Sequence, residues 1–454
     1  MVLESRGMAL RYLEITGGVP LHGTIDIQGS KNAVLPVLAA SMLGDGGCVI
    51  ENCPVIGDVE DLLTIMRSLG CKVRRKGHRV SIDAGTMKKY EIKEKSASRI
   101  RSSVLFLGAL LGKMGKVVLP MPGGCAIGQR PIDLHLYAME QLGVRFSVLE
   151  EDCRMAEAGS MQCMPGQRIR ADVKQLAGAE IHFSFPSVGA TENAILAAVM
   201  AEGQTIICNA ALEPEIDELC AFLNRRGARI RRLEDGSISI QGVRKLYPVV
   251  YRMRADRIVA GTYLLAAAAT GGSIRIRNFP WEDLVSLLEV LRRMGVDYRK
   301  NGCELELAEG GVSLPVSYLE TAPYPGFPTD LQSQLMAVLC RVHGKSCICE
   351  RIFENRFATA EELQKMGADI TTEGTCARIK GVETLSSADV EAPDLRGGAA
   401  LVIAALQTEG CTRIGHVEYI ERGYEDICRD LRSLGAEIRL ESEDGGWCER
   451  AHPD

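Results

Sequence analysis

The sequence has few aromatic side chains: they make up 5% of its 454 residues and include two tryptophans. Ala, Leu, Val and Ile must therefore fill most of the hydrophobic core. The sequence also lacks a basic excess, because 59 acidic and 53 basic residues give a net charge of −6. This balance argues against general nucleic-acid binding, which normally requires such an excess. A few focused Lys and Arg side chains can still bind anionic small molecules.

Long apolar runs and paired cysteines are missing as well. The longest apolar run, "TYLLAAAAT", is too short to span a bilayer, so we expect no membrane segment. The start, "MVLESRGMALRY", carries charges where a secretory signal has its apolar core. None of the 16 cysteines forms a C-x-x-C pair, and we expect no metal site. Most stand in apolar runs, as reduced core cysteines do, and the expected compartment is the cytoplasm.

The sequence contains a sixfold internal repeat. Each copy has an Ala/Leu-rich helix, a strand, a loop, a charged amphipathic helix and a glycine, as expected for an α/β protein. The amphipathic helices are acidic early and basic late, and their glycines are predicted to be left-handed caps. These glycines are Gly70, Gly143, Gly227, Gly295, Gly367 and Gly435. The Ala/Leu-rich helices are apolar nearly all round, which predicts that they are buried.

Six such copies suit two compact domains of three copies each. We predict one domain over residues 31–250 and a second over residues 1–30 together with 251–440. The chain is expected to cross between them near Tyr247–Ile258, and the N-terminal strand is expected to pair in the second domain. Residues 441–454 are predicted to be a disordered tail.

The copies differ where their buried helices begin. Such helix starts suit phosphate or carboxylate, because exposed N–H groups gather there. Ser30, Ser187 and Thr329 have an alternative interpretation as simple helix caps, and Lys31 and Arg101 as solvated charges. The conspicuous residues at these starts are Lys31, Asn32, Arg101, Ser187, Asp330, Asp394 and Arg396. Their joint pattern, at equivalent positions, favours an anion-binding site.

The loop "GGCAIGQRP" of the second copy contains Cys125 and Arg130. An arginine and free backbone amides favour a thiolate, so Cys125 is predicted to be reactive. The equivalent loops of the fifth and sixth copies contribute Arg356 and Arg422.

Several stretches resemble the enolpyruvyl transferases, and within them the branch that acts on UDP-N-acetylglucosamine. They are "GSKNAVLP", "GGCAIGQRPIDLH", "PSVGATEN", "EPEI", "TAPYPGFPTD", "FENRF", "DLRGGAALV" and "RGYE". The resemblance implies a two-domain inside-out α/β barrel of six α/β units, three per domain about a pseudo-threefold axis. Helices are then buried, sheets lie outside, and substrates bind between the domains. It implies no cofactor, and we expect a monomer.

The resemblance also implies transfer of the enolpyruvyl group of phosphoenolpyruvate to the 3-hydroxyl of UDP-N-acetylglucosamine, the first committed step of peptidoglycan synthesis. Asp330 is then the base, and Cys125 is the acid on a mobile lid, open to a covalent adduct and to fosfomycin-type epoxides. Lys31, Asn32, Arg101, Arg130, Arg356, Asp394 and Arg422 are implied to bind phosphoenolpyruvate. Implied contacts to the UDP-sugar are Asn32, Arg101, Arg130, Pro131, Ile132, Asp133, Leu134, His135, Ser187, Val188, Gly189, Asp330 and Phe353.

One position departs from the family pattern. The family usually has a lysine just before the aspartate of "DVED", and this chain has Gly57. A weakly active or non-catalytic paralogue is therefore an alternative. Two further alternatives are transfer to 3-phosphoshikimate and a hydrolase that uses Cys125 with His135.

Overall fold

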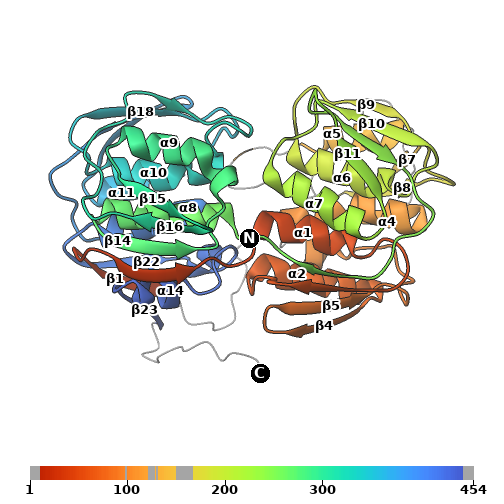
Figure 1. Cartoon of the computed structure of the whole chain (residues 1–454), viewed down its shortest axis with the longest axis horizontal. Helices are drawn as coiled ribbons and strands as arrows, with labels where there is room; N and C mark the ends of the chain where they lie inside the picture. Colours follow the sequence, from red (N-terminus) through yellow and green to blue (C-terminus); the bar gives the residue numbers. More distant parts are fainter. Residues whose placement is uncertain (1–10, 98–99, 121–127, 129–130, 150–166, 443–454) are drawn as a thin grey trace. The chain divides into compact units, whose positions relative to one another are not determined.

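The computed structural model describes residues 11–97, 100–120, 128, 131–149 and 167–442. Cys125 and Arg130 therefore lie outside the described residues. The chain divides into two compact units (Figure 1). One contains the described residues 11–28, 128 and 255–442, and the other contains the described remainder of 29–254.

The second of these units contains repeats one to three. Repeat one consists of α1 (Lys31–Ala40), β3 (Gly47–Glu51), α2 (Gly57–Leu69), β4 (Lys72–Lys76), β5 (Arg79–Asp83) and β13 (Val249–Arg252). Repeat two consists of α3 (Glu94–Ala97), the 3-10 helix η1 (Arg101–Leu105), α4 (Phe106–Met114), β6 (Lys116–Pro120), α5 (Asp133–Gln141), β7 (Arg145–Leu149) and β8 (Arg168–Asp172). Repeat three consists of β9 (Glu180–His182), α6 (Val188–Ala198), β10 (Gln204–Cys208), α7 (Pro214–Arg225), β11 (Arg229–Arg232) and β12 (Ile238–Gln241).

The first unit contains repeats four to six. Repeat four consists of β2 (His22–Asp26), α8 (Arg257–Ala269), β14 (Ser273–Arg277), η2 (Trp281–Leu284), α9 (Val285–Arg293), β15 (Tyr298–Asn301) and β16 (Glu304–Leu307). Repeat five consists of β17 (Leu319–Glu320), η3 (Thr329–Leu331), α10 (Gln332–Leu339), β18 (Lys345–Cys349), α11 (Ala358–Lys365), β19 (Asp369–Glu373) and β20 (Cys376–Lys380). Repeat six consists of β21 (Asp389–Glu391), α12 (Leu395–Leu406), β22 (Gly410–Gly415), α13 (Val417–Ile420), α14 (Ile427–Ser433), β23 (Glu437–Ser442) and β1 (Arg11–Gly17).

The repeats share one sheet topology, which gives a mixed α/β fold. Five of the described sheets have four strands, in which one outer strand is parallel to its neighbour and the other pairs are antiparallel. In repeat two, β6, β7 and β8 form the sheet, and a single parallel bridge from Glu91 to Val118 takes the place of the outer strand. Among the described strands, no sheet closes into a barrel.

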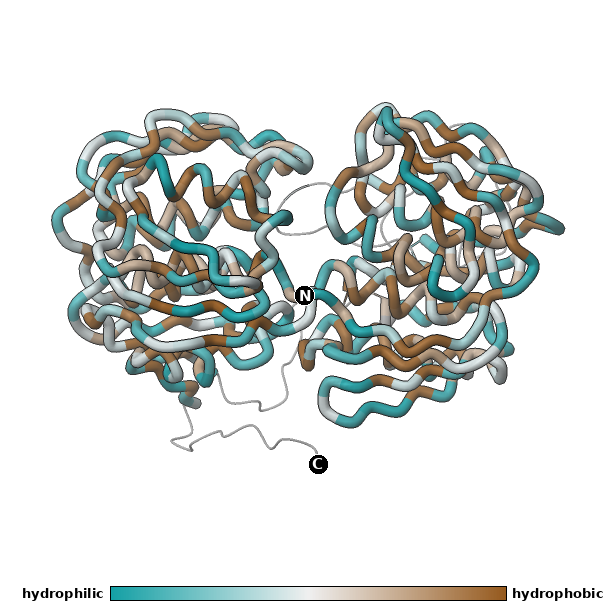
Figure 2. Tube along the Cα trace, viewed as in Figure 1, coloured by the Kyte–Doolittle hydropathy of each residue, from teal (hydrophilic) through white to brown (hydrophobic). Residues whose placement is uncertain are grey.

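The Ala/Leu-rich helices are buried, as the sequence predicts. Every residue of α10 and of α12 is buried. Many strands instead alternate between buried and more exposed residues, as β5 and β10 do. The edge strand β4, "KVRRK", is hydrophilic along most of its length (Figure 2). The six predicted cap glycines all have a positive φ, between 84° and 103°. The core of each unit is therefore built around its helices.

Strands from distant parts of the chain complete three sheets. The N-terminal strand β1 pairs with both β22 and β23 of repeat six, as the sequence predicts. The next strand, β2, pairs with β14 of repeat four, and β13 pairs with β3 of repeat one. The pairing of β2 also fits the expectation that the N-terminal stretch 11–29 pairs in the second domain, whereas the sequence did not indicate the pairing of β13 with β3.

Two sequence predictions need correction. Glu441 and Ser442 belong to β23, so the predicted tail begins too early, and residues 443–454 lie outside the described residues. Cys349 and Cys376, directly opposed on β18 and β20, form a disulfide, whereas the sequence predicts reduced thiols for most of the cysteines and a reducing compartment. Among the described residues, none of the helices has the length and apolar character needed to cross a membrane.

Candidate functional site

Asp330 lies in a cluster of charged side chains at the start of α10. Its Oδ1 accepts a hydrogen bond from Arg356 Nη2 at 2.5 Å, and its Oδ2 accepts one from Arg396 Nη2 at 2.8 Å. Both arginines are almost fully buried, whereas the Asp330 side chain is 25% exposed. Two cations therefore stabilise the carboxylate, and solvent or a substrate can still reach it.

Asp394 and Arg396 belong to the start of α12. The Asp394 side chain caps this helix by accepting from the backbone N–H groups of Arg396 and Gly397. Its Oδ1 also lies 3.6 Å from Arg356 Nη1. Burial is the largest single influence on the pKa of Arg396 and lowers it. The charges of Asp330, Tyr424 and Asp256, together with the hydrogen bond to Asp330, outweigh burial, so the net pKa is raised and Arg396 stays charged.

A second layer of hydrogen bonds holds this cluster in place. Glu350, at the end of β18, accepts from the hydroxyls of Thr321 and Thr329 at 2.8 Å each. It also accepts from the backbone N–H of Phe353, whose ring lies 5.4 Å from the guanidinium of Arg356. The Thr329 hydroxyl therefore serves this network and does not cap a helix, unlike the alternative raised from the sequence.

Lys31 forms a buried ion pair in the other unit. Its Nζ lies 2.9 Å from Asp58 Oδ2, and both side chains are at least 90% buried. Ser30 caps the same helix by accepting from the N–H of Ala33. Gly57, which directly precedes Asp58, is exposed at the first position of α2 and does not have a positive φ. The backbone conformation there does not require glycine.

His135 is buried beside Gly189. Asn193 donates through Nδ2 to His135 Nδ1 at 2.8 Å and to Val104 O, and its Oδ1 accepts from Gly108 N–H. This fixes the Asn193 amide, so His135 Nδ1 must accept and its Nε2 carries the proton. A Cβ on Gly189 would lie 2.9 Å from the ring, so only glycine fits.

The environment of His135 argues against the hydrolase alternative. Burial and, to a smaller extent, the positive charge of Arg101 lower the pKa of His135 to about 3. The ring is therefore neutral, and its acceptor nitrogen is already used by Asn193. A general base needs a free acceptor nitrogen.

The structure also describes the other predicted residues in each unit. Ser187 caps α6 through the N–H of Ala190 and is followed by Val188. Asn32, Arg101, Leu134 and Ser187 are half-buried, Ile132 is buried, and Pro131 and Asp133 are exposed. Arg422 is half-buried in the turn after α13. Gln28 holds this turn by donating to Gly423 O and accepting from Glu425 N–H.

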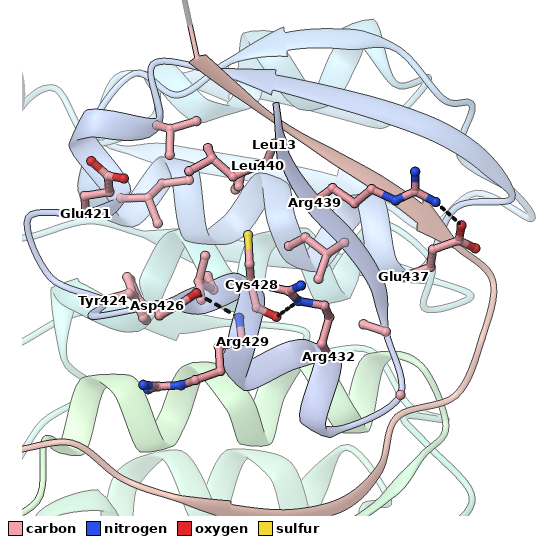
Figure 3. Close-up of a pocket in the computed structure, with 16 residues that line it drawn as sticks. Leu13, Glu421, Tyr424, Asp426, Cys428, Arg429, Arg432, Glu437, Arg439 and Leu440 are labelled. Carbon is pink, nitrogen blue, oxygen red and sulfur yellow. Dashed lines mark hydrogen bonds and ion pairs between the residues drawn. The ribbon is translucent and has the colours of Figure 1, made fainter. Parts of the chain in front are cut away.

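A separate pocket of about 590 Å³ lies where α14, β23 and β1 meet (Figure 3). Glu421 and Tyr424 line it, but Asp330, Arg356 and Asp394 do not. Its arginines already have partners: Arg429 pairs with Asp430, Arg432 donates to Cys428 O, and Arg439 pairs with Glu437. This pocket is distinct from the Asp330 cluster.

Arg396 is the main residue whose role the sequence did not reveal. It stands at a helix start, but nothing in the sequence marks it as a partner of Asp330, 66 residues away. Its place in the first turn of a buried helix, where repeat one has Lys31, is the available signal. Asn193, which orients His135, stands inside "PSVGATEN", and no sequence pattern points to this contact.

Comparisons with known proteins agree with this arrangement. The sequence model of the family described as EPSP synthase (3-phosphoshikimate 1-carboxyvinyltransferase) matches residues 15–431. UDP-N-acetylglucosamine 1-carboxyvinyltransferase 2 of Caldanaerobacter subterraneus subsp. tengcongensis is 44% identical, over 94% of this chain and 98% of that protein. UDP-N-acetylglucosamine 1-carboxyvinyltransferase 1 of Legionella pneumophila is also 44% identical, over 96% of this chain and 84% of the relative.

Solved structures show the same fold. The enolpyruvyl transferase NikO from Streptomyces tendae aligns with a TM-score of 0.84 and 25% identity, over 96% of this chain and all of that one. An EPSP synthase from Acinetobacter baumannii aligns with a TM-score of 0.71 and 18% identity, over 95% of this chain and all of that one. From the family match, the relatives and the fold together, the chain belongs to the EPSP synthase family of enolpyruvyl transferases.

Proposed function

We propose that this enzyme transfers the enolpyruvyl group of phosphoenolpyruvate to the 3-hydroxyl of UDP-N-acetylglucosamine and releases phosphate, a step of peptidoglycan synthesis. The carboxylate of Asp330, held by two buried arginines yet partly exposed, is the observation that carries the proposal. The names of the relatives support this acceptor. The proposal includes the inside-out barrel arrangement within each unit, a cytoplasmic location and a monomer without cofactor.

Asp330 is the proposed base for the sugar hydroxyl. A carboxylate offers about four lone-pair positions, so the two arginines leave room for a third hydrogen bond. The hydroxyl donates its proton to Asp330 while its oxygen attacks C2 of phosphoenolpyruvate. The arginines keep the carboxylate in one orientation, so less conformational entropy is lost when the reactive geometry forms.

Cys125 is the proposed acid and belongs to the region outside the described residues. It delivers a proton to C3 of phosphoenolpyruvate as the new C2–O bond forms, which gives a tetrahedral intermediate. The C2–O bond to phosphate then breaks and C3 returns a proton to the Cys125 thiolate, which restores the double bond and the thiol. Lys31, Arg101, Arg130 and Arg422 are proposed to balance the charges of the phosphate and carboxylate.

Phosphate release tests this proposal. The enzyme is given phosphoenolpyruvate with either UDP-N-acetylglucosamine or 3-phosphoshikimate, and we expect release only with the nucleotide sugar. Release only with 3-phosphoshikimate would make that molecule the acceptor, and release with neither acceptor would overturn the proposal. Asp330→Ala and Cys125→Ser are expected to lower the rate at least a hundredfold. The exposed residues Asp369 and Cys303 provide the controls Asp369→Ala and Cys303→Ser.

Gly57→Lys tests the weakly active alternative. The lysine would stand next to Asp58, the partner of Lys31, and would add a cation at the start of α2. If the missing lysine limits activity, kcat/KM for phosphoenolpyruvate is expected to rise about tenfold, which is the effect of one modest charge contact. An unchanged kcat/KM would show that the existing cations suffice.

A further inference from the structure

Three potential metal ligands meet on the outer face of the repeat-three sheet. They are Glu180 and His182 on the edge strand β9 and Cys208 at the end of β10. Their ligand atoms all lie within 4.8 Å of one another. Residues two apart on a strand share a face, and His182 lies directly beside Cys208 in the parallel register. The three side chains therefore point to one spot.

We propose that Glu180, His182 and Cys208 bind a divalent cation of the zinc type. Thiolate sulfur, imidazole nitrogen and carboxylate oxygen are the donors that Zn²⁺ takes, and three protein ligands leave its fourth position open to water. Zinc bonds of about 2.1 Å in a tetrahedron place ligand atoms about 3.4 Å apart. The two contacts in the free site, 2.9 Å from His182 Nε2 to Glu180 Oε1 and 3.9 Å from Cys208 Sγ to the same oxygen, lie on either side of that value.

The backbone holds the ligands in register. Asn209, directly after Cys208, has a φ of 53° and donates through Nδ2 to Phe183 O at 2.9 Å. Phe183 N–H in turn donates to Cys208 O at 3.2 Å. The ends of β9 and β10 are thus joined immediately after His182 and Cys208, and sites on such fixed elements bind metals with little rearrangement.

The other repeats provide an internal comparison. The positions of His182 and Cys208 correspond to Asp26 and Arg277 in repeat four, which form an ion pair of 3.3 Å. In repeat one they correspond to Arg252 and Glu51, again of opposite charge. The equivalent residues are Glu320 and Cys349 in repeat five and Glu391 and Gly415 in repeat six. The ion pair of repeat four shows that side chains at these two positions can meet across the strands, and repeat three places an imidazole and a free thiol there.

The charge around Cys208 suits a cation. Burial, the carboxylate of Glu180 and that of Asp235 raise the pKa of the Cys208 thiol. The free thiol therefore keeps its proton at neutral pH, and a cation replaces that proton when the metal–sulfur bond forms. A bound ion would fasten the edge strand β9 to β10 and offset the local negative charge.

Direct metal binding tests this proposal without measuring enzyme activity. The full chain, freed of metal, is titrated with Zn²⁺ against a coloured chelator, and with Co²⁺ while the thiolate-to-cobalt absorption is recorded. We expect one equivalent with a dissociation constant in the micromolar range or below. Cys208→Ser and His182→Gln are each expected to weaken binding about tenfold or more.

Exposed residues elsewhere provide matched controls. Cys303→Ser and His343→Gln should leave the affinity and the cobalt absorption unchanged. Melting temperatures in the presence of a chelator establish that each variant is folded, and Zn²⁺ should raise the melting temperature of the parent but not of Cys208→Ser. Zn²⁺ binding that is only millimolar, or a cobalt absorption that persists in Cys208→Ser, would overturn the proposal. Because no substrate is used, failure here leaves the proposed reaction untouched.

Discussion

The two arginines that hold Asp330 come from different elements. Arg356 lies in the loop before α11, whereas Arg396 belongs to the first turn of α12 and is anchored there by the Asp394 cap. Each occupies one oxygen of the carboxylate. The orientation of Asp330 therefore depends on the relative placement of repeats five and six, which no short motif encodes.

Arg396→Lys separates charge from geometry at this carboxylate. A lysine keeps the positive charge but is a compact ammonium that cannot reproduce the guanidinium contact. We expect kcat to fall about tenfold or more, equivalent to about 1.4 kcal/mol in the barrier, while KM changes less. Steady-state kinetics with both substrates measure this split. Arg378→Lys, in an exposed pair with Glu373, is the control, and equal kinetics for both variants would contradict the role of Arg396.

His135 gives the native state a specific acid sensitivity. Its pKa is about 3 in the folded protein, chiefly because of burial, and about 6.5 in an unfolded chain. Below pH 6.5 this histidine is protonated in the unfolded chain but stays neutral in the native state. The free energy of unfolding therefore falls by about 1.4 kcal/mol per pH unit until about pH 3. From pH 7 to pH 5 this amounts to about 2 kcal/mol.

His135→Gln removes that proton uptake. Denaturant unfolding at pH 7 and pH 5 should show a loss about 2 kcal/mol smaller for the variant than for the parent. His343→Gln changes an exposed histidine and should keep the full loss. Equal losses for the parent and His135→Gln would show that His135 is protonated in the folded protein.

At the scale of single elements, left-handed residues end the helices and strands of the repeats. Besides the six cap glycines, Asn52, Asn209, Asn278 and His416 have φ values of 53° to 54°, and each follows a strand at the same place in its repeat. Asn tolerates this conformation better than most residues. The repeat therefore fixes two turns, one with glycine and one mostly with asparagine.

Gly143 isolates the backbone cost of such a turn. Its φ is 91°, and an added Cβ would meet no atom within 4 Å, so substitution brings conformational strain without a clash. Gly143→Ala is expected to lower the free energy of unfolding by about 1 kcal/mol, and Gly143→Asn by less. Urea unfolding measures both. Gly47→Ala, at a position without positive φ and with its nearest contact at 3.5 Å, should be close to neutral.

The sequence predicted the helices and strands better than it predicted which strands pair and which side chains meet. The helical periodicity and the cap glycines such as Gly227 are properties of short stretches of sequence, so the sequence predicts them directly. The partner of a strand such as β2 is chosen by long-range packing, and so is the pairing of Arg396 with Asp330. Asp330, Arg356 and Asp394 lie together in one unit, and His135 lies beside Gly189 in the other, but the roles of these residues and of Cys125 stay predictions.

At the scale of the whole molecule, the N-terminal strand β1 completes the sheet of repeat six. β1 lies between β22 and β23, and its Leu13 and Ile15 are buried in the core of that unit. Repeat six thus obtains from the N-terminus the strand that the other repeats take from their own hairpins. The unit that contains residues 255–442 therefore needs the N-terminal strand β1 to complete its sheet and its core.

Removing residues 1–17 tests this dependence. Without β1, both β22 and β23 lose a hydrogen-bonded neighbour, and the core loses two fully buried side chains that are each worth about 2–5 kcal/mol. Such a loss approaches the whole stability of a typical domain. Hydrogen exchange measured by mass spectrometry should show protection lost across residues 255–442 and retained in α1, α4 and α6.

Removing only residues 2–9, which precede β1, should leave protection unchanged. The double variant Leu13→Ala, Ile15→Ala keeps the strand and should give an intermediate loss, whereas full protection of β22 without β1 would mean that repeat six closes by itself.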